Sequence, residues 1–200
     1  MIRVLVLVPS EFNCFSKFER KVNRITQSFS EFTVVYPEDN NKLVQKLFEN
    51  RENVTLEANK NWDISSITHA IVFDDGEVFP EELAELKNHS VPVRVINISI
   101  TRVVNIKKEE KYQGIKSTPN FEYIGRGSYW GNPYSMYEEG DDRDEVIRKY
   151  RYDFEFDKFI NIEKSKVYDL AGKRLGCFCK PAACHGDVLA EYLNSWDDGK

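Results

Sequence analysis

Two spacings of apolar residues alternate along the first half of the chain, and they predict a repeating order of strands and helices. Residues 91–98 predict one strand, and apolar runs rich in valine and isoleucine occupy residues 2–8, 32–36 and 69–73. Such runs are typical of strands that are covered on both faces. Apolar side chains recur at helical spacing in residues 12–29, 41–50 and 80–88. Strands that alternate with helices predict a parallel α/β sheet.

The second half of the chain has a different pattern, which predicts a separate small domain. Residues 101–122 are polar and irregular, and they predict a linker or a pair of short strands. Beyond them, the pattern predicts a helix, a strand and a helix at residues 141–152, 173–179 and 186–196. We therefore expect an α/β domain over residues 1–105 and a small α+β domain over residues 106–200.

Composition narrows the class of protein. The 200 residues are 41% hydrophobic, which is enough for a buried core, and the net charge is −5. An acidic balance does not indicate nucleic acid as a partner, although a local basic patch would be compatible with one. No apolar run is long enough to cross a membrane, and the short apolar stretch at residues 1–9 is interpreted as a buried strand and not as a signal peptide. The unevenly spaced cysteines do not form a disulfide framework, which favours a reducing cytoplasm.

The densest chemistry in the chain is a cysteine and histidine cluster near the C-terminus. Cys177, Cys179, Cys184 and His185 fall within nine residues. Thiolates and imidazole are ligands that zinc and iron prefer, and these four would complete a tetrahedral shell. The spacing is unlike that of a common zinc finger, and adjacent residues such as Cys184 and His185 rarely aim at one ion. The alternative is that the cysteines are small buried residues under a helix.

The same segment also has a catalytic interpretation. Cys184, His185 and Asp187 lie at the start of a predicted helix. The helix dipole lowers the pKa of a thiol at that position, and the free N–H groups hold anions. These three residues would then supply the reactive groups. The residues alone leave the metal, catalytic and structural interpretations open.

A second candidate site is the glycine-rich loop at residues 125–133. Its glycines allow close backbone approach to a ligand, and Arg126 is suited to clamping a phosphate or a carboxylate. Trp130 offers a face for stacking a base, and Asn132 offers a donor and an acceptor. With Ser128, these residues form a predicted substrate-binding set. The alternative is a tight surface loop with an aromatic plug.

Two weaker candidates complete the set. The acidic residues at 141–145 are typical of a helix start, and within them Arg143 alone is kept as a substrate-binding candidate. In parallel sheets, ligands collect at the carboxyl ends of strands, where they contact a ribose or a metal. The predicted cofactor-binding residues at such ends are Ser10, Asp74, Asp75 and Gly76. An ordinary turn is the alternative for the last three.

The order of motifs after residue 121 resembles an uncharacterised domain family of bacteria and their phages. The matching residues are, in order, 123–126, 130–133, 143, 172–179 and 184–189. The family pattern usually has tryptophan between the first two cysteines, where this chain has Phe178. The resemblance implies that these residues belong to one site, and it implies no particular activity.

The first half of the chain resembles the Rossmann-like nucleotide-binding superfamily that includes cytokinin-activating phosphoribohydrolases and the DNA-uptake protein DprA. The matching features are the first strand with Ser10 after it, and the later segments 70–76 and 92–96. The glycine-rich signature that this superfamily carries midway is absent, and residues 57–61 stand near its place. The resemblance implies a Rossmann-like fold that binds a nucleotide.

These observations lead to one main expectation and one alternative. The main expectation is a protein that binds a nucleotide or nucleoside derivative, with hydrolysis or transfer at its glycosidic or phosphate linkage as a further step. The alternative is a non-catalytic, metal-stabilised interaction module of phage or defence type that binds a host protein or a nucleic acid. The alternative requires Trp130 to lie in an exposed apolar patch. The main expectation requires the residues 125–132 and the cysteine cluster to face one pocket.

Overall fold

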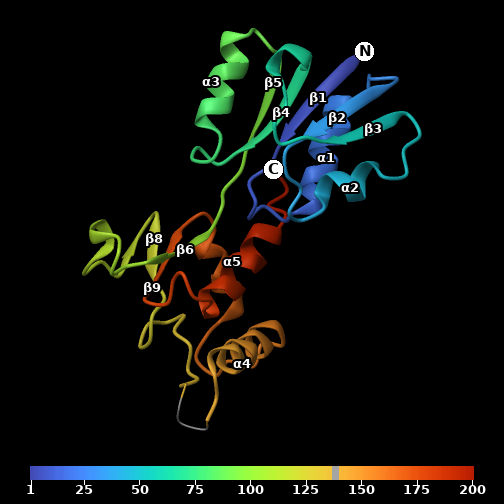
Figure 1. Cartoon of the computed structure of the whole chain (residues 1–200). Coiled ribbons are helices and arrows are strands. Elements are labelled where there is room, and N and C mark those ends of the chain that lie inside the picture. The colour runs from blue at the N-terminus through green and yellow to red at the C-terminus, as the bar shows by residue number, and fades with distance from the viewer. Residues whose placement is uncertain (137–139) are drawn as a thin grey trace. The chain divides into compact units, whose positions relative to one another are not determined.

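The computed structural model describes residues 1–136 and 140–200 of the chain. These residues form two compact units, one of Met1–Ile98 with Ser195–Lys200 and the other of Ser99–Asn194 (Figure 1). The division lies between Ile98 and Ser99, whereas the sequence pattern placed it after residue 105. Each unit has its own sheet and its own buried apolar cluster.

The first unit is built on a parallel sheet. Its strands are β1 (Ile2–Leu7), β2 (Phe32–Tyr36), β3 (Val54–Ala58), β4 (His69–Asp74) and β5 (Val93–Asn97). Their order is β3-β2-β1-β4-β5, and every neighbouring pair is parallel. The chain adds strands to one side of β1 up to β3 and then to the other side, beginning with β4. Parallel sheets bind ligands at the point between β1 and β4 where this order reverses. The predicted Rossmann-like α/β fold is confirmed.

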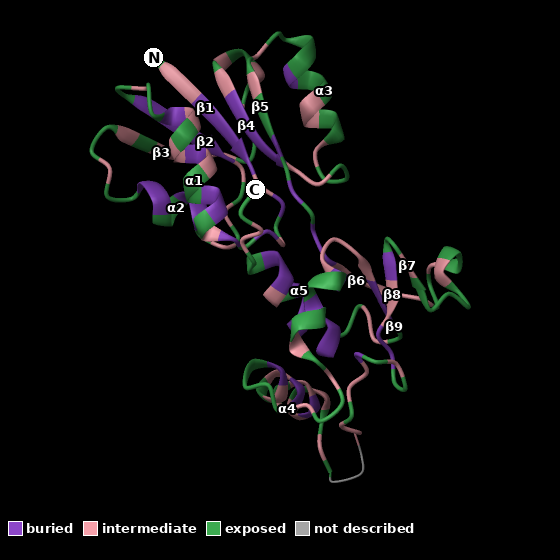
Figure 2. Ribbon diagram, turned by 180° about the vertical axis from the view of Figure 1, so that it is seen from behind, coloured by how far each residue is buried: buried purple, intermediate pink, exposed green. Residues whose placement is uncertain are grey.

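Burial along the strands explains why the sequence pattern missed β3. The central strands β1, β2 and β4 are mostly buried, and the edge strands β3 and β5 carry exposed side chains (Figure 2). A strand covered on both faces needs a continuous apolar run, and an edge strand does not. The strand β3, with the sequence VTLEA, has no such run and was missed for this reason.

Helices follow three of the strands, as predicted. They are α1 (Phe15–Thr26) after β1, α2 (Leu43–Phe48) after β2 and α3 (Pro80–Asn88) after β4. The 3-10 turn η1 (Ile64–Ser66) lies between β3 and β4. Phe18 anchors α1 through a stacked contact with Phe73 of β4, with ring centroids 5.3 Å apart. The helix α1 starts later than predicted, because the chain first makes a turn in which the Phe12 N–H donates to the Pro9 carbonyl.

The second unit contains a smaller, mixed sheet. Its strands are β6 (Arg102–Asn105), β7 (Ser117–Thr118), β8 (Phe121–Tyr123) and β9 (Arg174–Cys177), in the order β6-β9-β8-β7. The strand β9 pairs in parallel with β6 and β8, and β7 pairs antiparallel with β8. The polar stretch at residues 101–122 therefore supplies strands and the 3-10 turn η2 (Glu110–Tyr112). The linker interpretation of that stretch is wrong.

Helices and one long 3-10 segment complete the second unit. They are α4 (Arg143–Glu155), η3 (Lys164–Leu170) and α5 (His185–Ser195). Asp142 caps α4 by accepting a hydrogen bond of 2.8 Å from the Glu145 N–H, as the acidic pattern predicted. Tyr150 and Phe154 of α4 and Leu189 of α5 are buried in one apolar cluster. None of the described helices is long and apolar enough to cross a membrane.

Close packing at Gly176 of β9 generates a test of this core. A Cβ atom at Gly176 would collide with the ring of Phe121, which is buried and stacked on Tyr112. We predict that Gly176→Ala lowers the free energy of unfolding by about 1–3 kcal/mol, the usual cost of overpacking, although alanine normally suits a strand better than glycine. Chemical denaturation measures the effect.

The collision with Phe121 is tested by a second substitution. The double variant Gly176→Ala/Phe121→Leu should lose less stability than the sum of the losses of the two single variants. The reason is that the smaller leucine side chain leaves room for the methyl group of the introduced alanine. Strictly additive losses would show that the ring of Phe121 is not the obstacle.

Candidate functional site

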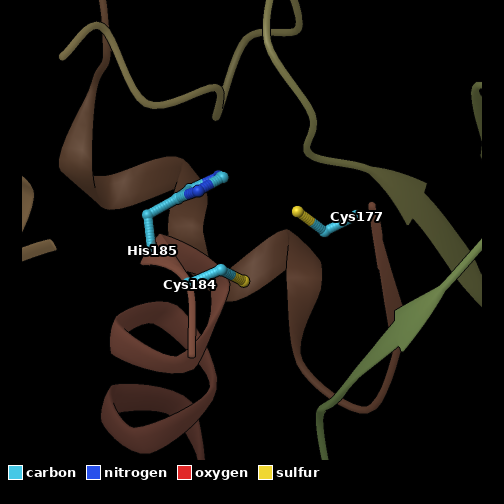
Figure 3. A group of neighbouring side chains, drawn as sticks. All are labelled: Cys177, Cys184 and His185. Carbon is cyan, nitrogen blue, oxygen red and sulfur yellow. The ribbon is translucent and has the colours of Figure 1, made fainter. Parts of the chain in front are cut away.

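The strand β9 and the helix α5 bring three predicted metal ligands together. Cys177 is the last residue of β9, Cys184 precedes α5, and His185 is its first residue. One ligand atom from each of the three lies within 4.8 Å of the others, and all three residues are buried. Their side chains point toward a common space (Figure 3). Cys184 and His185 are adjacent in the chain and nevertheless direct their side chains to one space, which adjacent residues rarely do.

A hydrogen bond fixes the ring of His185. Its Nε2 lies 2.8 Å from the carbonyl oxygen of Ile124, and a carbonyl can only accept, so Nε2 carries the proton. Burial lowers the pKa of His185, and the nearby Cys177 opposes this shift. A neutral ring with Nε2 protonated leaves the Nδ1 lone pair as the possible metal ligand. Metal-binding histidines commonly donate their other N–H to a backbone carbonyl in this way.

Within the cluster, Cys177 is the cysteine whose pKa is lowered. A hydrogen bond from the Cys184 thiol lowers the pKa of Cys177, and the backbone N–H of Cys179 acts in the same direction. The pKa of Cys184 is raised by its hydrogen bond to Cys177, by burial and by the charge of Asp187. The sequence analysis expected the helix dipole to activate Cys184. The contact between the two sulfurs instead lowers the pKa of Cys177 and raises that of Cys184.

Cys179 stands apart from the other predicted ligands. Its Sγ lies 3.5 Å from that of Cys177, but it does not belong to the group of three within 4.8 Å. Burial raises the pKa of Cys179, while the guanidinium of Arg143 acts against this. The described residues therefore offer three converging ligands with a thiol beside them, and not the closed shell of four that the sequence predicted.

A pocket of the second unit joins the two motifs that the sequence analysis singled out. Gly125, Arg126 and Asn132 of the glycine-rich loop line it together with Arg143. The same pocket is lined by the cluster residues Cys177, Cys179, Cys184 and His185. The guanidinium of Arg126 is exposed and has no ion pair with any residue in the described part of the chain. The requirement that both motifs face one pocket is met.

The aromatic residue exposed at this pocket is Phe178 and not Trp130. Trp130 is only 4% exposed and belongs to the apolar core of the second unit. The prediction that it stacks a base is wrong, because its ring faces are covered by protein. Phe178 lines the pocket and is 49% exposed. The alternation of side chains along Cys177-Phe178-Cys179 could have identified Phe178. If the two cysteines point inward, the residue between them points outward.

Other predicted binding residues hold the loop in place. Asn132 donates to the Val146 carbonyl at 3.1 Å and accepts from the Tyr134 N–H at 2.9 Å. It therefore ties the loop to α4, and its polar atoms are engaged within the protein. Arg143 donates to the Ala183 carbonyl at 3.1 Å, which ties the start of α4 to the cysteine segment. The buried Oγ of Ser128 has no hydrogen-bond partner among the described residues.

Asp187 has a structural role at the start of α5. Its Oδ2 accepts a hydrogen bond of 2.9 Å from the Cys184 N–H, in the manner of a capping box. Its Oδ1 lies 2.6 Å from the Nζ of Lys180. Both oxygens are thus engaged within the protein, and neither is directed at a reacting group. The prediction that Asp187 is catalytic finds no support in this geometry.

The predicted cofactor-binding residues lie in the first unit, at the carboxyl ends of β1 and β4. Asp74 accepts from the Gly76 N–H at 3.0 Å, and Asp75 accepts from the N–H groups of Glu77 and Val78. Ser10 donates to the side chain of its neighbour at 2.9 Å. The two aspartates therefore stabilise the turn after β4, as the turn interpretation had it. They do not belong to the pocket of the second unit.

Comparison with known families identifies the first unit. Residues 1–104 match the family model described as Minimal SLOG domain. The chain belongs to the minimal SLOG domain family. Membership indicates a nucleotide-related role, and it confirms the predicted resemblance to Rossmann-like nucleotide-binding proteins. Behind the minimal SLOG domain, residues 104–195 match a model described as a domain of unknown function (DUF4326).

A phage protein is similar to part of the chain. It is an uncharacterized 12.4 kDa protein from the nrdA-td intergenic region of Enterobacteria phage T4, and it is 39% identical over 72 residues. The matched stretch covers 36% of this chain and 65% of the phage protein, which is less than two thirds of the length of that relative. The predicted similarity to phage proteins is confirmed. No solved structure matches the chain.

The role of Asp187 generates a prediction for stability. We predict that Asp187→Ala lowers the free energy of unfolding by about 1–2 kcal/mol, because it removes a capping acceptor and an ion pair. Thermal unfolding followed by circular dichroism measures the change. Asp169→Ala, at an exposed position of η3, is the matched control and should unfold like the wild type. An unchanged melting temperature for Asp187→Ala would contradict the capping role.

Proposed function

We propose that the pocket of the second unit binds a nucleotide or nucleoside derivative, and that the cluster of Cys177, Cys184 and His185 acts on its glycosidic or phosphate linkage when it holds zinc or iron. In this proposal Arg126 and Arg143 hold phosphate, and Phe178 stacks the base. The observation that carries the proposal is that the loop and the cluster line the same pocket. The nucleotide-related family of residues 1–104 supports the choice of ligand class.

Charge and shape support a phosphorylated ligand. Arg126 brings an exposed guanidinium to the rim, and a guanidinium matches the oxygens of a phosphate in bidentate fashion. Arg143 adds a second positive group on the side of Cys179. Phe178 offers an exposed ring, and a base of any kind can stack on such a face. Cationic groups and an aromatic face at one pocket are the groups that a nucleotide needs.

The arrangement of the cluster favours a reactive metal over a structural one. Structural zinc sites are closed by four protein ligands, whereas catalytic zinc sites have three and keep one position for water or substrate. The described residues supply three converging ligand atoms, and these residues also line the pocket. A zinc ion held there would lower the pKa of a bound water and so supply a nucleophile near neutral pH.

The interaction-module alternative loses the feature on which it depended. It required Trp130 in an exposed apolar patch, and Trp130 is buried in the core.

The four cysteines are free thiols, which fits the reducing cytoplasm where we place the protein as part of this proposal.

The proposal predicts a defined loss of nucleotide binding. Arg126→Ala should weaken the binding of ADP at least tenfold, because a hydrogen bond to a charged group contributes about 1.5–3 kcal/mol. Phe178→Ala should weaken it by a similar factor, and Phe178→Trp should preserve it. Isothermal titration calorimetry at constant ionic strength measures the dissociation constants. Panels of other nucleotides, with chromatography of released base or phosphate, separate cleavage from binding alone.

Matched substitutions away from the pocket control for charge and for loss of an aromatic ring. Arg148→Ala removes an exposed arginine of α4 that pairs with Glu145, and Phe156→Ala removes an exposed ring at the end of that helix. Both controls should bind ADP as the wild type does. Equal binding by Arg126→Ala, Phe178→Ala and the controls would exclude the pocket as the nucleotide site.

The cluster predicts one metal ion per chain. Mass spectrometry of protein purified anaerobically without chelator should find about one zinc or iron per chain, and Cys177→Ser should lose it. Cys14→Ser, which removes the buried cysteine of the first unit, is the matched control and should retain the metal. Iron with visible absorbance would indicate redox chemistry, and colourless zinc would indicate hydrolysis.

Cys179→Ser distinguishes an open metal site from a closed one. Retention of the metal in Cys179→Ser would show that three ligands suffice, which is the arrangement the proposal requires. Loss of the metal in that variant would make Cys179 a fourth ligand, and the site would then be closed and structural. Absence of metal from the wild type would remove the metal from the proposal altogether.

A further inference from the structure

The turn after β6 places a cation beside the exposed ring of the pocket. The Nζ of Lys107 lies 5.4 Å from the centre of the Phe178 ring, and both side chains are exposed. Phe178 lines the pocket, and Lys107 is not among the described residues that line it. The positive charge of Lys107 therefore lies just outside the pocket, against the ring that we assign to the base.

Hydrogen bonds to the cysteine segment hold this turn in place. Asn105, the last residue of β6, accepts from the Lys107 N–H at 2.9 Å. Its amide group donates to the carbonyls of Phe178 and Lys180, at 3.2 and 2.5 Å. The Cys177 carbonyl accepts a further N–H group of the same turn at 3.1 Å. Because one side chain binds both backbone segments, the backbone at Lys107 has a fixed position relative to the ring and to the cluster.

The ammonium group of Lys107 is available to an anion. It makes no ion pair with any residue in the part of the chain that the structure describes, whereas Lys180 pairs with Asp187 on the cysteine segment. An ammonium group carries three N–H donors, so contact with a ring leaves donors for a second partner. Arg126 and Lys107 are thus two cations without ion pairs, one lining the pocket and one outside it.

The placement of these two cations sets the kind of ligand that would use both. The two phosphate groups of ADP are joined through one oxygen, so they would remain together at the arginines of the pocket. A nucleotide with phosphate at both the 5′ and the 3′ positions of its sugar has the sugar between them. With its base stacked on Phe178, such a nucleotide has one phosphate in the pocket and directs the other outward, where Lys107 lies.

We propose that Lys107 is a further binding residue of the pocket, and that the ligand is a nucleotide with phosphate at both the 5′ and the 3′ positions of its sugar. Arg126 binds one phosphate, Phe178 stacks the base, and Lys107 binds the other phosphate. A nucleoside 3′,5′-bisphosphate and the 5′-phosphorylated end of a single strand both present these groups. This inference rests on the proposed function, because it defines the ligand of the same pocket.

Probes that differ by one phosphate group test the role of Lys107. Adenosine 3′,5′-bisphosphate should bind the wild-type protein at least threefold more tightly than adenosine 5′-monophosphate does, which is the effect expected of an exposed ion pair. Lys107→Gln should remove this difference and leave the binding of the monophosphate and of ADP unchanged. Isothermal titration calorimetry at constant ionic strength measures the dissociation constants, and circular dichroism confirms that the variant is folded.

The adjacent lysine provides the matched control. Lys108→Gln removes an exposed positive charge from the same turn and should bind all three probes as the wild type does. Equal affinity of the wild type for the monophosphate and the bisphosphate would overturn the proposal, and so would a gain that survives Lys107→Gln. An equal loss in Lys108→Gln would also overturn it, because general charge would then explain the gain.

A dinucleotide distinguishes the two sources of this chemistry. If the 5′-phosphorylated dinucleotide pApA binds at least as tightly as the bisphosphate and loses the same factor in Lys107→Gln, the ligand is the end of a strand. Weaker binding of pApA, with the bisphosphate still dependent on Lys107, assigns the site to the free bisphosphate.

The proposed function and this inference fail in different ways. Monophosphate binding that Arg126→Ala leaves unchanged would contradict the pocket itself, and the inference would fall with it. Monophosphate binding that depends on Arg126, together with bisphosphate binding that ignores Lys107→Gln, would contradict this inference alone.

Discussion

The candidate site depends on one buried hydrogen bond, between the ring of His185 and the carbonyl of Ile124. Both groups are out of contact with water, and a buried polar group without a partner is costly, so the start of α5 must remain against the end of β8. Cys184 precedes His185 and is carried by the same constraint toward Cys177 at the end of β9. The glycine-rich loop begins directly after Ile124 and is brought to the other side of the same pocket. Glycine at position 186 allows this approach, because a Cβ atom there would meet the side chain of Ile124.

The two units share one local arrangement, a parallel strand followed by a loop and a helix, but they place different side chains on it. In each, a parallel strand leads through a loop to the start of a helix, β1 to α1 in the first unit and β9 to α5 in the second. In the first unit, Lys17 and Arg20 of the helix pair with Asp198 and Asp197 near the end of the chain. In the second, a thiol and an imidazole lie at the helix start, close to the thiol of Cys177 at the end of β9. Strand, loop and helix thus provide the same frame twice, and the two helix starts differ in the chemical groups that their side chains present.

Much of the fold could be predicted from the sequence, because strands covered on both faces must be continuously apolar. The strand β3 could not, since an edge strand alternates and looks like loop. The cluster was found by its residue types, but the opposite pKa shifts of Cys177 and Cys184 arise from the contact between β9 and α5, which no local pattern shows. The sequence also did not show which aromatic residue is exposed at the pocket. Trp130 and Phe178 both lie in motifs, and only the structure shows that Trp130 is buried and Phe178 is exposed. The contact of Asp197 with α1 joins residues far apart in the chain, and no local pattern carries it.

The short distances between free cysteine thiols have a consequence for the protein outside a reducing environment. Cys177 and Cys179 hold their Sγ atoms 3.5 Å apart, the Sγ of Cys184 lies within 4.8 Å of that of Cys177, and all three cysteines are free. Oxygen and peroxides attack thiolates before thiols, and the sulfenic acid that forms condenses with a neighbouring thiol. Oxidation at Cys177 would therefore be passed on within the cluster, and a disulfide would leave neither of its sulfurs as a thiolate that could serve the proposed metal. Protein kept reduced and protein exposed to air would be two different chemical species, so preparations of the same chain could disagree about its activity.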